Sequence, residues 1–308
     1  MLRIGTRGSA LALWQANHVG SLLSERGVAA EIITIRTSGD EGGIRHSGIA
    51  VKGTFTKEIE TALVERRVDI AVHSLKDLMI DLPPGLVVAA YPERADRRDA
   101  LVTRERVGLA DLPRGARVGT ASLRRRAAVL RARPDLHMIP LRGNVPTRLR
   151  RVDDGTVDAA VLAMAGLERL GLGDRGVPLD PEVVVPAPGQ GALAIEAREL
   201  DTATLEIIAA LDDEDVRMSV EAERAALARL ETGCNVPIGA TCLPHAGRWN
   251  LRVTVYAVDG TESMTSVVPV DADRPRAAGT RAAEELLGRG ARRLIDGAME
   301  AATGGEVP

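Results

Sequence analysis

Aromatic residues and lysine are scarce in this chain of 308 residues, and cysteine occurs only twice. Phe, Trp and Tyr together make up 2% of the residues, so Leu, Val, Ile and Ala must build the core. The two cysteines, Cys234 and Cys242, are too few for a disulfide framework. Lys52, Lys57 and Lys76 are the only lysines, so arginine is the default cation and a retained lysine is a candidate for a specific role.

Long apolar runs are also missing. The sequence contains no stretch of about 18 apolar residues that could span a membrane. The first residues, MLRIGTRGSALALW, lack the basic, apolar and small-residue regions of a signal peptide. We therefore expect a cytoplasmic chain without a membrane segment. Its length and its composition, 45% hydrophobic and 27% charged, are typical of a globular protein of two or three domains.

Arginine, in contrast, is concentrated in one segment. Residues 114–151 hold eleven Arg, no Lys and a single acid, Asp135, although the formal net charge of the whole chain is −3. The segment contains no aromatic residue to stack on bases, and the chain is acidic as a whole, which disfavours a nucleic-acid partner. No phosphate-binding loop of the G-x-x-x-x-G-K-[ST] type occurs. A small molecule with several carboxylates fits this segment better.

Predicted strands and helices alternate over the first two thirds of the chain. This alternation favours parallel or mixed sheets with helices on both faces. The strands are expected at 2–5, 30–37, 68–74, 86–91, 116–120, 137–141 and 158–163, and the helices at 9–26, 56–67, 122–133 and 146–155.

The pattern changes near residue 200. An acidic helix is expected at 213–231, a hairpin with Asp259-Gly260 at its turn over 248–270, and a last helix at 274–297. This part of the chain therefore predicts a small α+β domain.

Several predicted strands are followed by a small polar residue or an arginine and then by a helix. Helix N-termini bind anions, and the arginine guanidinium pairs with carboxylates in a bidentate manner. The residues in this setting are Arg7, Ser9, Thr120, Ser122, Arg124, Arg125, Arg142 and Arg148. Arginines within the predicted helices are expected on solvated faces instead: Arg126, Arg131, Arg133, Arg150 and Arg151.

Two further segments have open interpretations. In DIAVHSLKDL, a strand delivers Ser74, Lys76 and Asp77 to its carboxyl end, where Lys and Asp can form a charge pair, cap a helix or lie in a reaction centre. In LETGCNVPIG, Cys234 is a small buried side chain or a reactive attachment point. Cys234, Cys242 and His245 lack an evident fourth ligand, so we expect no metal.

Six ordered motifs resemble those of the porphobilinogen deaminase family, also called hydroxymethylbilane synthases. They are RIGTRGSALALWQA, DIAVHSLKD, VGTASLRR, LRGNVPTRL, PGQGALAIE and ETGCNVPIG, and they cover nearly the whole chain. The resemblance implies a transferase of tetrapyrrole biosynthesis. The family joins four porphobilinogen molecules head to tail with loss of ammonia and releases the linear hydroxymethylbilane with water. Its growing product is a polycarboxylate, in line with the arginine-rich segment.

The resemblance also implies a cofactor and the residues around it. The family carries a dipyrromethane primer in thioether linkage to a cysteine, here Cys234, and uses a catalytic carboxylate, here Asp77. That carboxylate would stabilise the positive charge that develops on the pyrrole nitrogens. The positions that match cofactor- or substrate-binding residues are Arg7, Ser9, Lys52, Ser74, Lys76, Thr120, Ser122, Arg124, Arg125, Arg142, Arg148 and Arg169.

The implied fold is α/β with three domains, two of them resembling the lobes of periplasmic binding proteins and the third a small C-terminal α+β domain. Domain 1 would comprise 1–92 and 187–211, domain 2 would comprise 93–186, and domain 3, with the cofactor loop, would comprise 212–308. We expect a monomer that binds no nucleic acid. The alternative is a non-catalytic, two-lobed polycarboxylate-binding protein.

Two departures from the family pattern bear on the site. Ala121 stands where a second serine is common, which removes one hydroxyl and predicts weaker contact with retained activity. The segment GIAVKGTFTKE has less glycine before Lys52 than is usual, so closure over the site is expected to differ.

Overall fold

The computed structural model describes residues 1–37, 56–230 and 236–303. The chain forms two compact units and passes from one to the other three times. Unit 1 consists of Met1–Ala95 and Gly191–Met218, and unit 2 consists of Asp96–Gln190 and Ser219–Pro308.

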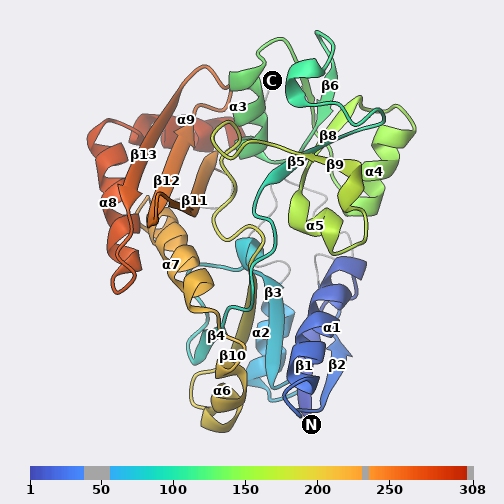
Figure 1. Ribbon diagram of the computed structural model, residues 1–308, viewed down its shortest axis with the longest axis vertical. Helices are drawn as coiled ribbons and strands as arrows, with labels where there is room; N and C mark the ends of the chain where they lie inside the picture. Colours follow the sequence, from blue (N-terminus) through green and yellow to red (C-terminus); the bar gives the residue numbers. More distant parts are fainter. Residues whose placement is uncertain (38–55, 231–235, 304–308) are drawn as a thin grey trace. The chain divides into compact units, whose positions relative to one another are not determined.

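Unit 1 is built on a five-stranded mixed sheet of order β2-β1-β3-β10-β4 (Figure 1). Strand β1 is parallel to β2 and β3, whereas β10 is antiparallel to both of its neighbours, β3 and β4. The strands are β1 (Leu2–Thr6), β2 (Ala30–Thr34), β3 (Ile70–Ser74), β4 (Leu86–Ala90) and β10 (Leu193–Arg198).

Helices α1 (Ala10–Ser24) and α2 (Lys57–Val64) cover opposite faces of this sheet. Val72 packs in one apolar core with residues of α1, and its neighbour Ala71 packs in another with residues of α2. Successive strand residues point to opposite faces, so the two cores lie on the two sides of β3. A short 3-10 helix, η1 (Leu75–Asp77), follows β3, and α6 (Thr202–Ala209) follows β10.

Unit 2 repeats this plan with the strand order β7-β6-β8-β5-β9. Strand β6 is parallel to β7 and β8, and β5 is antiparallel to β8 and β9. Ala127 of α3 and Leu149 of α4 belong to separate apolar cores, again on the two faces of the sheet. The elements are β5 (Asp99–Thr103), η2 (Leu109–Asp111), β6 (Arg117–Gly119), α3 (Leu123–Ala132), β7 (His137–Ile139), α4 (Val145–Asp153), β8 (Ala159–Ala163), α5 (Met164–Glu168), η3 (Gly173–Arg175) and β9 (Gly176–Pro178).

The C-terminal part of unit 2 is an antiparallel meander with helices. Helix α7 (Glu214–Arg229) precedes the strands β11 (Ile238–His245), β12 (Arg248–Tyr256) and β13 (Ser263–Pro269). The predicted hairpin is confirmed, and Gly260 in its turn has a φ of +76°, which suits glycine. The prediction of one last helix was wrong. Gly290, with a φ of +88°, separates α8 (Pro275–Gly288) from α9 (Arg292–Thr303).

The predicted fold class, α/β lobes followed by a small α+β part, is confirmed by these sheets. Strands β5, β9, β10 and β11 were not predicted, because each needs tertiary partners that a local pattern does not reveal. The partition into three domains stays a prediction, since the structure separates into two units rather than three.

Candidate active site

The carboxyl ends of β1 and β3 gather the predicted site residues of unit 1. These strands are parallel neighbours, with Ile4 beside Ile70 and Gly5 beside Ala71. Arg7 and Ser9 follow β1, while Ser74 ends β3 and is followed by Lys76 and Asp77 in η1. Parallel neighbours end at the same edge of a sheet, where ligands of open α/β folds bind. The structure therefore brings these five residues to one edge, as the sequence predicts.

Hydrogen bonds fix the backbone at both strand exits. The Ser9 hydroxyl accepts from the Ala12 amide at 3.3 Å and caps α1. Gln15 in α1 donates from Nε2 to the Ser74 hydroxyl at 2.8 Å. The β3 ladder continues one residue further, because the Leu75 amide donates to the Ala192 carbonyl at 3.1 Å. The turn that carries Asp77 thus begins from a firmly held strand end.

Asp77 itself is exposed, and within the part of the chain that the structure describes it forms no hydrogen bond or ion pair. Lys76 beside it is half-buried. The capping interpretation of Asp77 finds no support in the described residues, where Ser74 at the N-cap of η1 makes no side-chain capping hydrogen bond and Asp77 makes none either. Its carboxylate is therefore available to a ligand at the edge of the sheet.

A buried group of titratable side chains lies beneath this edge. His73 in β3 contacts Glu196 in β10, with 2.9 Å between Nε2 and Oε2. Glu60 of α2 is buried nearby, and burial raises the pKa of its carboxyl group, an effect that the charge of Glu196 reinforces. These residues were not predicted from the sequence, although an acid within the apolar run ALAIEAR is a signal for a buried partner.

In unit 2, the parallel strands β7, β6 and β8 likewise end at one edge. Thr120 and Ser122 follow β6, Arg142 and Arg148 follow β7, and Arg169 ends the short helix after β8. The Ser122 hydroxyl caps α3 by accepting from the Arg125 amide at 3.4 Å. Thr120, Ser122, Arg142 and Arg148 thus follow their strands as predicted, whereas Arg169 was expected only from the family resemblance.

The cations at this edge differ in burial. Arg142 is exposed, and Arg148 is half-buried with its Nε donating to the Gly143 carbonyl at 2.8 Å. Arg169 is buried, and desolvation lowers the pKa of its guanidinium to about 10, against the opposing charge of Glu168. A ligand carboxylate would reduce this cost of burying a cation. Ala121, where the family commonly has serine, is exposed between Thr120 and Ser122.

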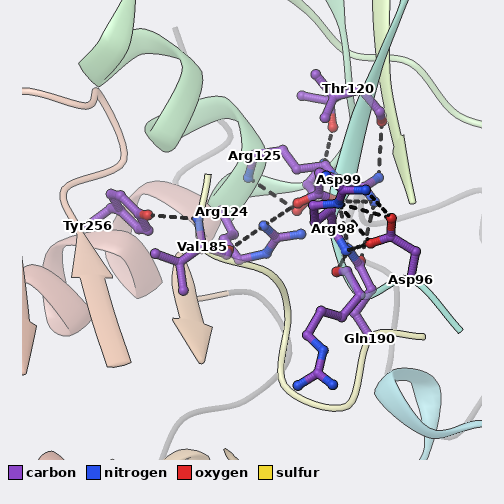
Figure 2. A network of polar contacts seen from close by, with 12 residues as sticks. Asp96, Arg98, Asp99, Thr120, Arg124, Arg125, Val185, Gln190 and Tyr256 are labelled. Carbon is purple, nitrogen blue, oxygen red and sulfur yellow. Dashed lines mark hydrogen bonds and ion pairs between the residues drawn. The ribbon is translucent and has the colours of Figure 1, made fainter. Parts of the chain in front are cut away.

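Arg124 and Arg125 converge on one carboxylate, that of Asp99 (Figure 2). Arg124 donates to Asp99 Oδ2 at 2.6 Å and to the Val185 carbonyl at 2.7 Å. Arg125 donates to Asp99 Oδ1 from Nε and a terminal nitrogen, at 2.9 and 2.7 Å. Gln190 adds a donor to Asp99 Oδ1 at 2.9 Å. Both arginines, chosen from the sequence as ligand-binding groups, are thus also held by the protein itself.

The environment of Asp99, which is fully buried, acts on its pKa in two opposite ways. Desolvation would raise this pKa, but the charges of Arg124 and Arg125 and the hydrogen bonds from Arg124 and Gln190 hold it well below its usual range. Two guanidinium groups thus stabilise one carboxylate in a dry environment.

Two of the helical arginines correct the expectation of a solvated face. Arg126 is half-buried, and burial lowers the pKa of its guanidinium. Arg133 donates to the carbonyls of Leu109, Ala110 and Leu112 and pairs with Asp135. It therefore ties the segment before β6 to the end of α3. Arg131, Arg150 and Arg151 are exposed, as predicted.

Two predicted site residues, Lys52 and Cys234, lie outside the described residues. The metal alternative at Cys234 is therefore not tested. In the described ranges, no helix is long and apolar enough to cross a membrane.

Comparisons with known proteins cover almost the entire sequence. The family model for the porphobilinogen deaminase, dipyromethane cofactor binding domain, matches residues 2–206, and that for the porphobilinogen deaminase C-terminal domain matches residues 218–288. The porphobilinogen deaminase of Desulforudis audaxviator is 47% identical, over 95% of this chain and 96% of its own length. The porphobilinogen deaminase of Syntrophotalea carbinolica is 45% identical, over 96% of this chain and 95% of its own length.

Solved structures align more weakly. A periplasmic substrate-binding protein of an ABC transporter from Coxiella burnetii is 17% identical, with a TM-score of 0.44, over 70% of this chain and 94% of that one. Because this TM-score is low, the fold description rests on the strand orders given above.

Proposed function

This chain belongs to the porphobilinogen deaminase family, and we propose that it is a hydroxymethylbilane synthase. Such an enzyme condenses four porphobilinogen molecules head to tail with loss of ammonia and releases the linear tetrapyrrole by hydrolysis. The observation that carries the mechanism is the exposed Asp77 carboxylate at the exit of β3, which forms no hydrogen bond or ion pair in the described part of the chain.

The family's dipyrromethane primer fits the donor set of unit 2. A dipyrromethane built from porphobilinogen carries acetate and propionate side chains, and unit 2 places the guanidinium groups of Arg124 and Arg125 in the first turn of α3, directly after β6. Arg124, Arg125 and Thr120 would hold these carboxylates, with Cys234 as the point of attachment. The bound primer supplies a pyrrole with a free α-carbon as the acceptor for the first substrate.

Asp77 would act by electrostatic stabilisation. Porphobilinogen becomes electron-poor as its amino group leaves, and positive charge develops on its pyrrole nitrogen. A fixed carboxylate close to that N–H lowers the energy of this charge and can accept the proton when needed. Since Asp77 forms no ion pair with a cation of the described residues, its carboxylate is available to the substrate.

The remaining site residues would bind carboxylates rather than take part in bond formation. Arg7, Ser9, Ser74 and Lys76 belong to the edge of unit 1. Arg142, Arg148 and Arg169, with Ser122, belong to that of unit 2, and Lys52 would add a further cation. Planar guanidinium groups suit this task because they pair with carboxylates in a bidentate manner. A product that gains two carboxylates with each substrate added needs several such groups.

We also propose that the enzyme is a cytoplasmic monomer that needs no metal or nucleic acid. The three-domain partition remains part of this proposal. The non-catalytic polycarboxylate-binding alternative would leave Cys234 unmodified and release no ammonia.

The test is the intact mass of the denatured protein, measured beside a Cys234→Ala variant and combined with a turnover assay of Asp77→Ala. We expect a mass increment of two linked pyrroles that Cys234→Ala lacks. Asp77→Ala should keep this increment but lose several powers of ten in turnover, because it removes the main electrostatic stabilisation. A bare polypeptide that stays bare after incubation with porphobilinogen would exclude the proposed function. Near-normal turnover by Asp77→Ala would exclude only the role of Asp77.

A further inference from the structure

The buried His73–Glu196 pair in unit 1 has no place in the mechanism above. Its side chains are 5% and 0% exposed, and it joins the central strand β3 to the antiparallel strand β10. Neighbouring residues on this face, such as Ala71 and Ile59, form an apolar core. A polar pair in such a place costs desolvation energy, and an apolar pair of similar volume is often as stable. Overall stability alone is therefore not a sufficient reason for the pair.

The polar group is also incompletely satisfied. Within the part of the chain that the structure describes, Glu196 Oε1 and Glu60 Oε1 are buried and have no hydrogen-bond partner. Buried polar atoms nearly always find partners, so an exception calls for an explanation. A hydrogen bond joins Nε2 of His73 to Oε2 of Glu196, and Glu60 lies close enough for the charges of both residues to act on it. The imidazole is thereby held in one orientation against β10.

The position of His73 along the chain points to the role of the pair. His73 is the last residue of β3 but one, and Asp77 follows four residues later. Ala194 lies opposite His73, Leu193 lies opposite Ser74, and the Leu75 amide reaches the Ala192 carbonyl. The side-chain contact to Glu196 reinforces this ladder just before the chain turns into η1. Any shift of β3 along β10 would move Asp77 by a similar amount.

We propose that His73 and Glu196 are positioning residues that set the location of the Asp77 carboxylate by locking the end of β3 against β10. The inference rests on the proposed function, since it assumes that Asp77 acts on the substrate. A displacement of about 1 Å in a reacting group can cost as much as 100-fold in rate, so the pair can matter without touching substrate.

The test is a comparison of His73→Leu with His73→Gln in the primer-loaded protein. The Nε2 of a glutamine lies about as far from the backbone as the Nε2 of His73, so Gln can still donate to the Glu196 carboxylate. Leu has no polar atom and removes this hydrogen bond. We expect His73→Leu to lower kcat by about 10-fold with KM changed less than about 2-fold, and His73→Gln to restore most of the loss. Intact mass must show the primer in both. Asp158→Asn is the control, because it breaks a 2.8 Å ion pair with Arg117 of β6 in unit 2, and we expect it to leave kcat unchanged.

A double-mutant cycle shows whether the effect passes through Asp77. In an Asp77→Glu background, where the carboxylate is already displaced, His73→Leu should cost less than about 3-fold. If His73→Leu lowers kcat as much in the Asp77→Glu background as in the wild type, the inference is overturned. Equal kcat of His73→Leu and wild type overturns it as well. If His73→Leu does not fold, Glu196→Gln must show the same loss confined to kcat. Normal turnover by Asp77→Glu would instead count against the proposed role of Asp77.

Discussion

Each unit carries a fully buried carboxylate on the strand that runs antiparallel to its central parallel strands, but the two have different partners. Asp99 in β5 of unit 2 contacts two arginines from α3. Glu196 in β10 of unit 1 contacts one histidine, with a second acid, Glu60, close by. The two sheets share a strand plan, yet one buried carboxylate lies with two cations and the other with a histidine and a second acid.

This difference indicates two roles for buried polar groups. The guanidinium groups around Asp99 belong to residues that the family resemblance assigns to ligand binding. The acids around His73 lie among apolar residues on the α2 face of the sheet, while the Ser74 side chain accepts a hydrogen bond from α1. These acids face the interior of unit 1, which suits a role in placing the backbone.

The largest expected effect is on unit 2. Asp99→Asn leaves two buried guanidinium groups without their carboxylate and should destabilise the protein by about 3–5 kcal/mol. Asp96→Asn is the matched control: it breaks the 2.6 Å pair with Arg98, whose side chain is 45% exposed, and should cost no more than about 1 kcal/mol. The shift of the urea midpoint measures both. Equal shifts of the urea midpoint in the two variants would mean that the buried Asp99 cluster stabilises the protein no more than an exposed ion pair.

The stabilisation by Asp99 should also depend on pH. The pKa of Asp99 is lower in the folded than in the unfolded chain, so its contribution to stability is complete above about pH 4, where the unfolded carboxyl is ionised. It is lost as the pH falls from there toward the depressed pKa. The stability gap between wild type and Asp99→Asn should therefore be constant from neutral pH to about pH 5 and narrow below about pH 4. A gap independent of pH would mean that the carboxylate charge is not the stabilising feature.

The sequence predicted the parallel strands, the helices between them and the polar residues at their ends, because these signals are local. Arg7, Ser9, Thr120 and Ser122 follow short apolar runs, and the cap at Ser122 is a short-range feature. Strand β10 could not be predicted from the sequence, because it lies between β3 and β4 only after the chain returns to this sheet about 100 residues later.

The ion-pair partner of Arg124 and Arg125 could not be predicted from the local sequence either. Arg124 and Arg125 were selected as ligand-binding groups from their position after β6, but nothing nearby in sequence indicated Asp99, which lies about 25 residues earlier on an unpredicted strand. Glu196 and His73 are 123 residues apart. The available signal was a lone acid within an apolar run, which predicts a buried partner without naming it.

A smaller effect on stability is expected from Glu60, the second buried acid near His73 in unit 1. Its pKa is raised by burial, so its contribution to stability is complete below about pH 4.3 and is lost as the pH rises through the raised folded value. Glu60→Gln removes this loss and should raise the midpoint of thermal unfolding at neutral pH by roughly 1–3 °C, with no gain at pH 4. Glu65→Gln, which removes an exposed acid paired with Arg67 just after α2, is the control and should change little. A loss of stability in Glu60→Gln at neutral pH would mean that the second acid stabilises unit 1, and the contrast with the arginine-rich core of unit 2 would then not hold.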